Sequence, residues 1–167
     1  MYTVYISLVL NMQIDKEISI QIRNVWQKAS ISLLYTSGQV YNAYEKFFKR
    51  YDLTSQQYNA LRILRDFFSE PISTSVLRGQ MLDKMSDTSR LVSRLHAKGY
   101  VDVSRNSGDK RLVNISVSEK GEQLLAKIDP ELSELDTMLT GLTEEEANKL
   151  SELLEKARES IAVYDKR

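Results

Sequence analysis

Two short stretches contain residue types that serine hydrolases use at their active sites. Ser107 and Lys110 have the spacing Ser-x-x-Lys, and Ser86-Asp87-Thr88 is loosely similar to a second motif of the same enzymes. A serine nucleophile needs a base within hydrogen-bond reach and surroundings that exclude water. Ser107 lies in a stretch typical of an exposed turn, and the only histidine, His96, has no evident Ser or Cys partner. We therefore do not expect an enzyme.

The composition excludes several other kinds of chemistry. The chain has 167 residues, with no cysteine and one histidine. Without cysteine there is no disulfide framework, no thiolate metal site and no cysteine-based redox sensor. Zinc sites usually need several Cys or His ligands, so we expect no metal and no cofactor. The hydrophobic fraction of 42% is enough for a core and too low for a membrane protein, and we expect a cytoplasmic location.

A predicted helix from Ser86 to Lys98 carries a face that can contact nucleic acid. At about 100° per residue, one side of this helix is apolar and consists of Thr88, Leu91, Val92 and Leu95. The other side is small, polar and cationic, and consists of Ser86, Ser89, Arg90, Ser93 and Ala97, with Arg94 on the flank. Small residues let a helix approach base edges in the major groove, and arginine supplies bidentate contacts to guanine. A plain amphipathic surface helix has the same pattern, so the neighbouring elements decide between the two interpretations.

A predicted β-hairpin follows this helix. Residues 100–105 and 112–118 contain alternating apolar and polar residues, as strands with one buried face do. The turn between them is basic: Lys110 and Arg111 can reach phosphate or a narrow minor groove, and Arg105 lies at its edge. A carboxylate at Asp109 can hold an arginine in one orientation and keep the tip ordered. The alternative is a solvated hairpin with incidental charges.

Two further helices are predicted before the cationic helix. Thr54 and Gln57 can form a capping box that begins the first of them. Ser73 is the expected N-cap of the second, which is short. The order helix, helix, helix, hairpin is that of a winged helix-turn-helix, and it favours DNA binding by residues 86–98. In such a fold we also expect Ser73 and Thr74, at the N-terminus of the short helix, to contact DNA.

Charge is unevenly distributed along a chain whose formal net charge is zero. Residues 72–120 contain nine Lys and Arg against five Asp and Glu, whereas residues 121–167 contain six against twelve. A basic segment beside an acidic one is typical of a protein in which one part meets phosphate and another stays in solvent. Ordinary scatter of surface charge is the alternative.

Long helices are predicted towards both ends of the sequence. From Ile18 to about Arg50, apolar residues alternate in steps of four and three, which is the seam of a coiled-coil-like contact. Residues 119–140 are also predicted to be helical, with an interruption at Pro130. A last helix begins with a capping box of Thr143 and Glu146 and carries a second seam. The two seams are Ile22, Trp26, Ala29, Leu33, Thr36, Val40, Ala43 and Phe47, and Ala147, Leu150, Leu154, Ala157, Ile161 and Tyr164.

Between Leu53 and Leu125 these segments resemble the MarR family of bacterial transcription regulators. The matching motifs are Leu53-Thr54 with Gln57-Tyr58 and Leu61, Pro71-Ile72-Ser73 with Leu77, Ser86 to Leu95, Lys98-Gly99-Tyr100-Val101, Asp109-Lys110-Arg111 and Ser118-Glu119-Lys120-Gly121. The last two match the family's wing Asp-x-Arg and its Thr-Glu-x-Gly entry to the following helix, with Ser118 in place of Thr. The long flanking helices match the family's dimerisation helices in position and length.

The resemblance implies a homodimer whose terminal helices interlock and whose two winged lobes bind a near-palindromic operator in double-stranded DNA. It places six residues on the family's recognition-helix positions and two on its wing pair: Ser86, Asp87, Ser89, Arg90, Ser93 and Arg94, and Asp109 and Arg111. Family members usually repress transcription, and they often release DNA when a small aromatic or phenolic ligand binds.

The resemblance also indicates where such a ligand would bind, at the junction of the dimer helices and the DNA-binding lobe. The candidate lining residues are Trp26, Tyr35, Tyr41, Tyr44 and Tyr58. Aromatic residues at helical spacing are more often part of a core or an interface, so both interpretations remain open. The family's other release route, cysteine oxidation, is closed because the chain has no cysteine.

We therefore expect a mainly α protein with a small β-hairpin, namely a winged helix-turn-helix with long N- and C-terminal dimerisation helices. The expected parts are an N-terminal extension (1–17), a dimerisation helix (18–52), the DNA-binding lobe (53–118) and the C-terminal dimerisation helices (119–167). The start of the protein stays open between Met1 and Met12. The expected function is that of a DNA-binding repressor. A winged helix that binds protein instead of DNA is the alternative, because the fold alone does not decide between them.

Overall fold

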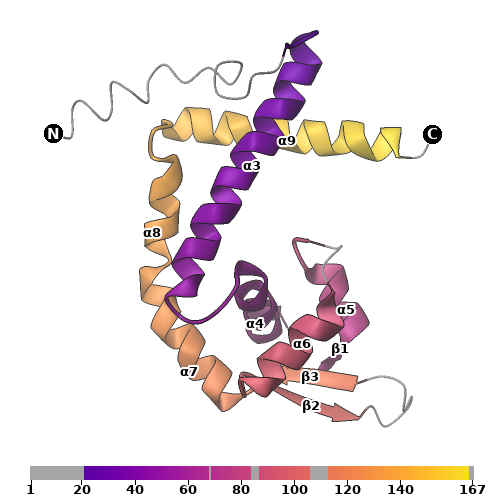
Figure 1. Cartoon of the computed structure of the whole chain (residues 1–167), viewed down its shortest axis with the longest axis vertical. Helices are drawn as coiled ribbons and strands as arrows, with labels where there is room; N and C mark the ends of the chain where they lie inside the picture. The colour runs from indigo at the N-terminus through magenta and orange to yellow at the C-terminus, as the bar shows by residue number, and fades with distance from the viewer. Residues whose placement is uncertain (1–20, 68, 84–86, 106–112, 166–167) are drawn as a thin grey trace, which may run out of the picture. The chain divides into compact units, whose positions relative to one another are not determined.

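The computed structural model describes residues 21–67, 69–83, 87–105 and 113–165 (Figure 1). Two compact units divide the chain, one over Met1–Ala43 and the other over Tyr44–Arg167. The boundary lies within helix α3 (Val25–Lys49), so the last turns of that helix belong to the second unit. Within the described residues, no helix is both long enough and apolar enough to cross a membrane.

The second unit consists of helices around one small sheet. In chain order after α3 the described elements are α4 (Ser55–Phe67), β1 (Ile72–Ser73), α5 (Thr74–Gln80), α6 (Thr88–Ala97), β2 (Val101–Arg105), β3 (Val113–Val117), α7 (Glu119–Ile128), η1 (Asp129–Glu131), α8 (Ser133–Asp136), η2 (Thr137–Leu139) and α9 (Glu144–Tyr164). The predicted fold class, a mainly α winged helix-turn-helix with a β-hairpin, is confirmed.

Three antiparallel strands form the sheet in the order β1–β3–β2. Val103 pairs with Ile115 in the hairpin, and Ile72 pairs with Ile115 on its other side. Ile115 is completely buried, because it lies on the central strand with the core against it. The hairpin was predicted from its alternating residues, but β1 was not, since two residues are too few to show a period of two.

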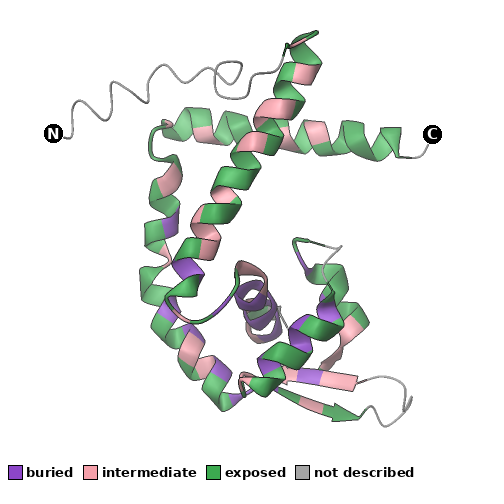
Figure 2. Cartoon of the chain, in the orientation of Figure 1, coloured by how far each residue is buried: buried purple, intermediate pink, exposed green. Residues whose placement is uncertain are grey.

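One apolar core fills the second unit and draws on nearly every element in it (Figure 2). The largest completely buried side chains are Phe48, Leu61, Ile63, Leu77, Leu95, Ile115, Leu125, Ile128 and Val101. Phe48 stacks on Tyr58 with ring centroids 4.1 Å apart and meets Phe47 edge-on at 5.0 Å. Such aromatic pairs add to the free energy of burial, and here they fix the last turn of α3 against α4.

Helix caps lie where the sequence predicts them. Gln57 N donates to Thr54 Oγ1, and Thr54 N donates to Gln57 Oε1, so the capping box of α4 is confirmed. Thr143 and Glu146 form the same reciprocal pair at α9. Pro130 lies in the first turn of η1, and the interruption predicted there is also confirmed, because proline has no N–H to continue the helix.

Two helices begin later than the sequence predicts. Helix α3 begins at Val25, and residues 21–24, which the sequence predicts to be helical, precede it. Asn24 Oδ1 accepts a hydrogen bond from Gln27 N at 2.8 Å and acts as the cap. Helix α6 begins at Thr88, with Asp87 as its N-cap, and not at Ser86. Apolar periodicity does not mark a helix start, whereas a capping side chain does.

The start of α7 passes very close to the backbone before β2. A Cβ atom at Gly121 would overlap the carbonyl oxygen of Tyr100 and would lie 2.8 Å from Val117 Cγ2. Only glycine, which has no Cβ, allows the helix to approach the strand this closely. The glycine of the Ser-Glu-x-Gly motif is therefore required by packing.

We expect Gly121→Ala to lower the free energy of unfolding by about 1–3 kcal/mol, because the added methyl group meets backbone that cannot move without displacing β2. Gly79→Ala is the matched control: nothing lies within 4 Å of its added Cβ, and alanine favours a helix over glycine by about 1 kcal/mol. Urea unfolding measures both variants. An unchanged midpoint for Gly121→Ala would contradict the close approach.

Candidate nucleic-acid interface

Helix α6 buries one side and exposes the other, as its sequence predicts. Thr88, Leu91, Val92 and Leu95 are buried. The exposed side, visible in Figure 2, includes Ser89, Arg90, Ser93 and Arg94. Because the buried side fixes the rotation of the helix about its axis, the two arginines and the two serines stay together on the outer surface. Such a surface can donate hydrogen bonds to phosphate and to base edges.

Asp87 closes the N-terminal end of α6. Its Oδ1 accepts a hydrogen bond from Arg90 N at 3.1 Å, which satisfies one of the backbone donors that every helix start leaves free. Its Oδ2 lies 3.1 Å from Arg90 Nε. Asp87 is thus both a helix cap and the partner of an arginine, two roles that the resemblance does not imply. Ser86, predicted as a DNA contact, lies outside the described residues.

The backbone closes the other end of α6 in the predicted way. Gly99 has a φ of 76°, a left-handed conformation that glycine adopts without strain. Gly99 N donates to His96 O at 2.8 Å, and Tyr100 N donates to Leu95 O at 3.0 Å. His96 Nδ1 lies 3.0 Å from the carbonyl oxygen of Val101, so the only histidine of the chain ties α6 to β2.

Side chains from α7 and from the residue before it also bond the carbonyl groups of the two residues that follow α6. Ser118 Oγ donates to Gly99 O at 2.7 Å and accepts from Gly121 N at 3.1 Å, so one hydroxyl serves both helices. Lys120 Nζ donates to Lys98 O at 2.7 Å, where its positive charge also complements the helix dipole. Sequence reasoning missed both contacts with α6, because they join residues far apart in the chain.

Lys98 links α6 to the loop after α3. Its Nζ lies 2.8 Å from Asp52 Oδ2 and also donates to the carbonyl oxygen of Asp52. Asp52 has a φ of 56°, in the left-handed region that short polar side chains tolerate best after glycine. The Asp52 side chain is exposed, so the ion pair contributes little to stability. What it adds is a fixed position for the end of α6.

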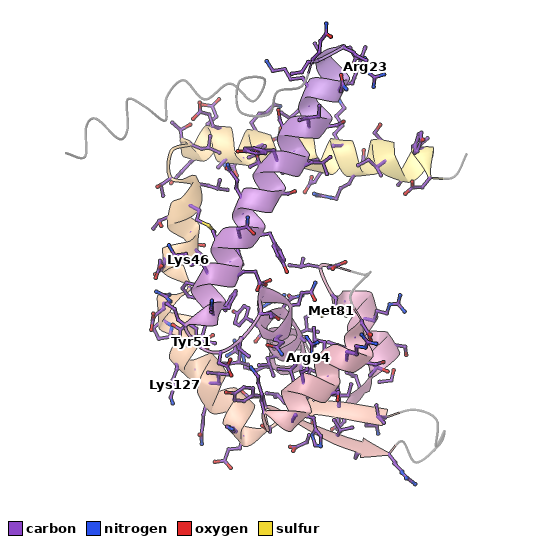
Figure 3. The ribbon with its side chains drawn as sticks, in the orientation of Figure 1. Arg23, Lys46, Tyr51, Met81, Arg94 and Lys127 are labelled. Carbon is purple, nitrogen blue, oxygen red and sulfur yellow. The ribbon has the colours of Figure 1, made fainter. Side chains whose placement is uncertain are left out.

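Helix α4 supports the segment that leads into α6. Gln56 Nε2 donates to Asp83 Oδ2 at 2.9 Å, and the buried Asn59 donates to Met81 Sδ at 3.7 Å. Met81 follows α5 and Arg94 lies on α6 (Figure 3). The described part of the turn between the two helices is therefore fastened to α4. These contacts were not predicted from the sequence, because polar residues on a helix such as α4 do not indicate which distant residues they will bond.

Ser73 and Thr74 lie at the N-terminus of α5, as predicted. Ser73 Oγ accepts from Val76 N at 3.3 Å and lies 2.8 Å from Ser75 Oγ, which confirms the cap. Thr74 is the first residue of α5 and is half-buried. Helix α5 packs against α6 and β3, so these residues belong to the same lobe as the exposed arginines. Their contact with DNA stays a prediction.

The strands of the hairpin are described, but its tip is not. Arg105 pairs with Val113 at the end of the ladder and is exposed. The other three wing residues, Asp109, Lys110 and Arg111, lie outside the described residues. The wing contacts therefore stay predictions.

The five aromatic residues predicted to line an effector pocket differ in their surroundings. Trp26 is 77% and Tyr41 is 49% exposed, whereas Tyr35 is half-buried. Tyr44 and Tyr58 both lie beside Phe48, at centroid distances of 6.1 and 4.1 Å. Burial raises the pKa of the Tyr58 hydroxyl. Tyr58 has a place in the core, and a ligand-binding role for the set stays a prediction.

An open depression of about 480 Å³ lies elsewhere, between the last turns of α3, the start of α4 and Lys98. Two of its charged groups already serve the fold: Asp52 pairs with Lys98, and Glu45 Oε1 accepts from Ser55 N at 2.8 Å. The depression thus lies at a junction of helices that Glu45 and Asp52 help to hold together.

Known proteins with a similar sequence or a similar structure are transcription regulators. No family model matches the chain. An HTH-type transcriptional regulator of Bacillus cereus is 28% identical over 128 residues, which cover 75% of this chain and 84% of that protein. The crystal structure of a MarR-like transcription regulator from Bacillus cereus is 25% identical, with a TM-score of 0.66, and the match covers 79% of this chain and 97% of that one.

A mutant MarR from E. coli, solved in complex with operator DNA, is 23% identical with a TM-score of 0.67, and the match covers 75% of this chain and 91% of that one. The resemblance to MarR-family transcription regulators, first seen in the sequence motifs, is confirmed by these matches. They extend the likeness beyond the motifs to the fold as a whole.

We expect Ser118→Ala to lower the free energy of unfolding by about 1–3 kcal/mol, because the Gly121 N–H and the Gly99 carbonyl both lose their partner. Ser151→Ala is the matched control, since the Ser151 hydroxyl is exposed and bonds only the Ala147 carbonyl oxygen of its own helix. Thermal unfolding compares the two. A Ser118→Ala variant as stable as the control would show that the shared hydroxyl is dispensable.

Proposed function

We propose that this chain is a sequence-specific DNA-binding transcription regulator that acts as a homodimer and represses its target genes. The observation that carries the proposal is the exposed side of α6, where Arg90 and Arg94 lie beside Ser89 and Ser93. Arginine can donate two hydrogen bonds to guanine, and small side chains let a helix lie deep in the major groove. The operator complex of the similar E. coli MarR supports this use of the fold.

The contacts at both ends of α6 support the same proposal. A helix that recognises bases must keep its position while it meets DNA, since ordering on binding lowers affinity. The C-terminal end is bonded by Ser118, Lys120 and Asp52, and the N-terminal end is capped by Asp87. A surface helix without a binding partner needs no such bracing.

The homodimer is proposed from the long helices, each considered by itself. Helix α3 exposes Val25, Trp26 and Leu34, and helix α9 exposes Ile161, Val163 and Tyr164. Exposed apolar residues in such number favour burial against a partner. Trp26, Ile161 and Tyr164 also belong to the seams predicted from the sequence. A second copy of the chain supplies matching seams, and two-fold symmetry would present two α6 helices to one near-palindromic duplex.

Release by a small aromatic or phenolic ligand is part of the proposal and rests on the resemblance to the MarR family. The chain has no cysteine, so oxidation of a thiol is not available as a signal. Ligand binding is the other release route of the family. The candidate lining residues are the five aromatic residues named above.

We expect the protein to bind random duplex DNA at low salt and to lose affinity as salt rises, because phosphate contacts release counterions. On a duplex that the wild type selects from a random library, Arg90→Ala should cost about 1–3 kcal/mol, and less on random DNA. Fluorescence anisotropy measures both. Arg158→Ala on α9, whose guanidinium lies 3.9 Å from Glu155, is the control and should bind as the wild type does.

Two results would contradict this. Binding that is absent at low salt would favour the alternative, a winged helix that binds protein. Equal losses on selected and random duplexes would show that Arg90 contacts phosphate and not a base.

We expect Trp26→Glu combined with Ile161→Glu to convert a dimer to a monomer, because each places a charge on an exposed apolar seam position that must become buried. Lys28→Glu with Asn148→Glu is the matched control, since both residues are exposed and lie off the seams. Sedimentation equilibrium gives the mass of each variant. A seam variant that stays dimeric would place the interface elsewhere.

A further inference from the structure

Arg90 and Arg94 lie one helical turn apart on the exposed side of α6, but they differ in one respect. Arg90 Nε lies 3.1 Å from Asp87 Oδ2. Arg94 forms no ion pair with any carboxylate of the described ranges. One guanidinium is therefore paired with a neighbouring carboxylate, and the other is not.

We propose that Asp87 is a positioning residue for DNA recognition: it turns the guanidinium of Arg90 so that the two terminal nitrogens face a guanine base, and it does not itself contact DNA. The inference rests on the proposed DNA-binding function. It changes the role that the resemblance gives to Asp87, which is that of one more recognition-helix contact.

The geometry of the carboxylate supplies the first step. Asp87 Oδ1 accepts from the backbone N–H of Arg90 at 3.1 Å, and Oδ2 faces Nε of the same residue at 3.1 Å. The backbone bond fixes the carboxylate, because Arg90 N is part of the helix start. The second oxygen is therefore an acceptor at a constant position, and it does not move with the arginine side chain.

The geometry of the guanidinium supplies the second step. A guanidinium carries five N–H donors in a planar fork. With Nε beside Asp87 Oδ2 at 3.1 Å, the two terminal nitrogens of Arg90 keep their donors for another acceptor. Guanine presents two acceptors, O6 and N7, to the major groove. Two parallel donors thus meet two acceptors, which is the bidentate contact that discriminates guanine from the other bases.

The exposure of the Asp87 and Arg90 side chains indicates that their ion pair positions Arg90 and does not mainly stabilise the fold. The Arg90 side chain is 81% exposed and that of Asp87 is 57% exposed, and ion pairs so exposed contribute little to folding. A side chain already held in its bound orientation loses less conformational freedom when it binds. A direct contact of Asp87 with DNA is disfavoured, because Oδ1 already accepts from Arg90 N, Oδ2 is paired with the Arg90 guanidinium, and the charge of Asp87 would repel phosphate.

The test uses Asp87→Ser in the full-length protein. Serine caps a helix about as well as aspartate, so α6 keeps its start, but serine has no second oxygen for Arg90 Nε. The DNA is a duplex selected by the wild type from a random library, with a random duplex as reference. Circular dichroism and thermal unfolding establish that every variant is folded. The set comprises D87S, R90A and R94A, with the double variants D87S/R90A and D87S/R94A.

We expect D87S to weaken binding to the selected duplex about tenfold, within the range of one bidentate base contact, and to leave binding to the random duplex nearly unchanged. D87S/R90A should bind no more weakly than R90A alone, because the positioning role vanishes with the arginine. D87S/R94A should show the product of the two single losses, since Arg94 has no contact with Asp87. Arg94 is therefore the matched control within the same helix.

A second readout does not depend on DNA. In ¹⁵N-edited NMR of the free protein, the Nε–H of Arg90 should be shifted and protected from exchange in the wild type, and it should resemble that of Arg94 in D87S. Identical Arg90 signals in the two proteins would overturn the positioning role.

The remaining outcomes are also decisive. If the fold-losses in affinity for the selected duplex caused by D87S and by R90A multiply in the double variant, the inference is overturned, since Asp87 would then act independently of Arg90. An unchanged affinity of D87S for the selected duplex would overturn it as well. A wild type that binds no duplex at all would remove the proposed function and this inference together, whereas a wild type that binds with multiplying losses removes the inference alone.

Discussion

The structure of the lobe depends on one backbone junction, where α6 ends, β2 begins and α7 begins. Gly121 allows α7 to lie against the Tyr100 carbonyl, and the Ser118 hydroxyl bonds both Gly99 O and Gly121 N. Gly99 makes the turn that ends α6 and leads into the hairpin. Because three elements share these few atoms, the direction of α6 and the direction of the hairpin depend on the same contacts.

The two ends of α6 are held in different ways, and the difference matches what a recognition helix needs. Its C-terminal end is bonded by side chains of Ser118, Lys120 and, through Lys98, Asp52. Its N-terminal end is capped by Asp87, close to the exposed Arg90. In helix-turn-helix proteins the N-terminal residues of the recognition helix contact base edges. The bonds of Ser118 and Lys120 therefore lie at the opposite end of α6 from Asp87 and Arg90.

The features that could be predicted from the sequence are those that depend on residues close together in the chain. The capping boxes at Thr54 and Thr143, the glycine turn at Gly99 and the two faces of α6 each depend on residues within one or two turns, and all were found. The start of α3 was wrong because apolar periodicity continues through the cap at Asn24. Contacts such as Lys98 with Asp52 or Gln56 with Asp83 could not be predicted, since they join segments that only the folded core brings together.

The placement of apolar and charged surface separates a DNA-binding lobe from a protein-binding one. Protein interfaces are rich in aromatic and aliphatic side chains at their centres, and α6 exposes no large apolar side chain among its described residues. The exposed apolar side chains gather instead on α3 and α9, in Trp26, Leu34, Ile161 and Tyr164 among others. A surface of arginine and serine suits a partner that presents phosphate and base edges. The exposed apolar residues of α3 and α9 suit a partner that presents the same apolar seams. This division favours nucleic acid for the lobe and a second copy of the chain for the helices, and a winged helix that bound another protein through α6 would need the opposite arrangement.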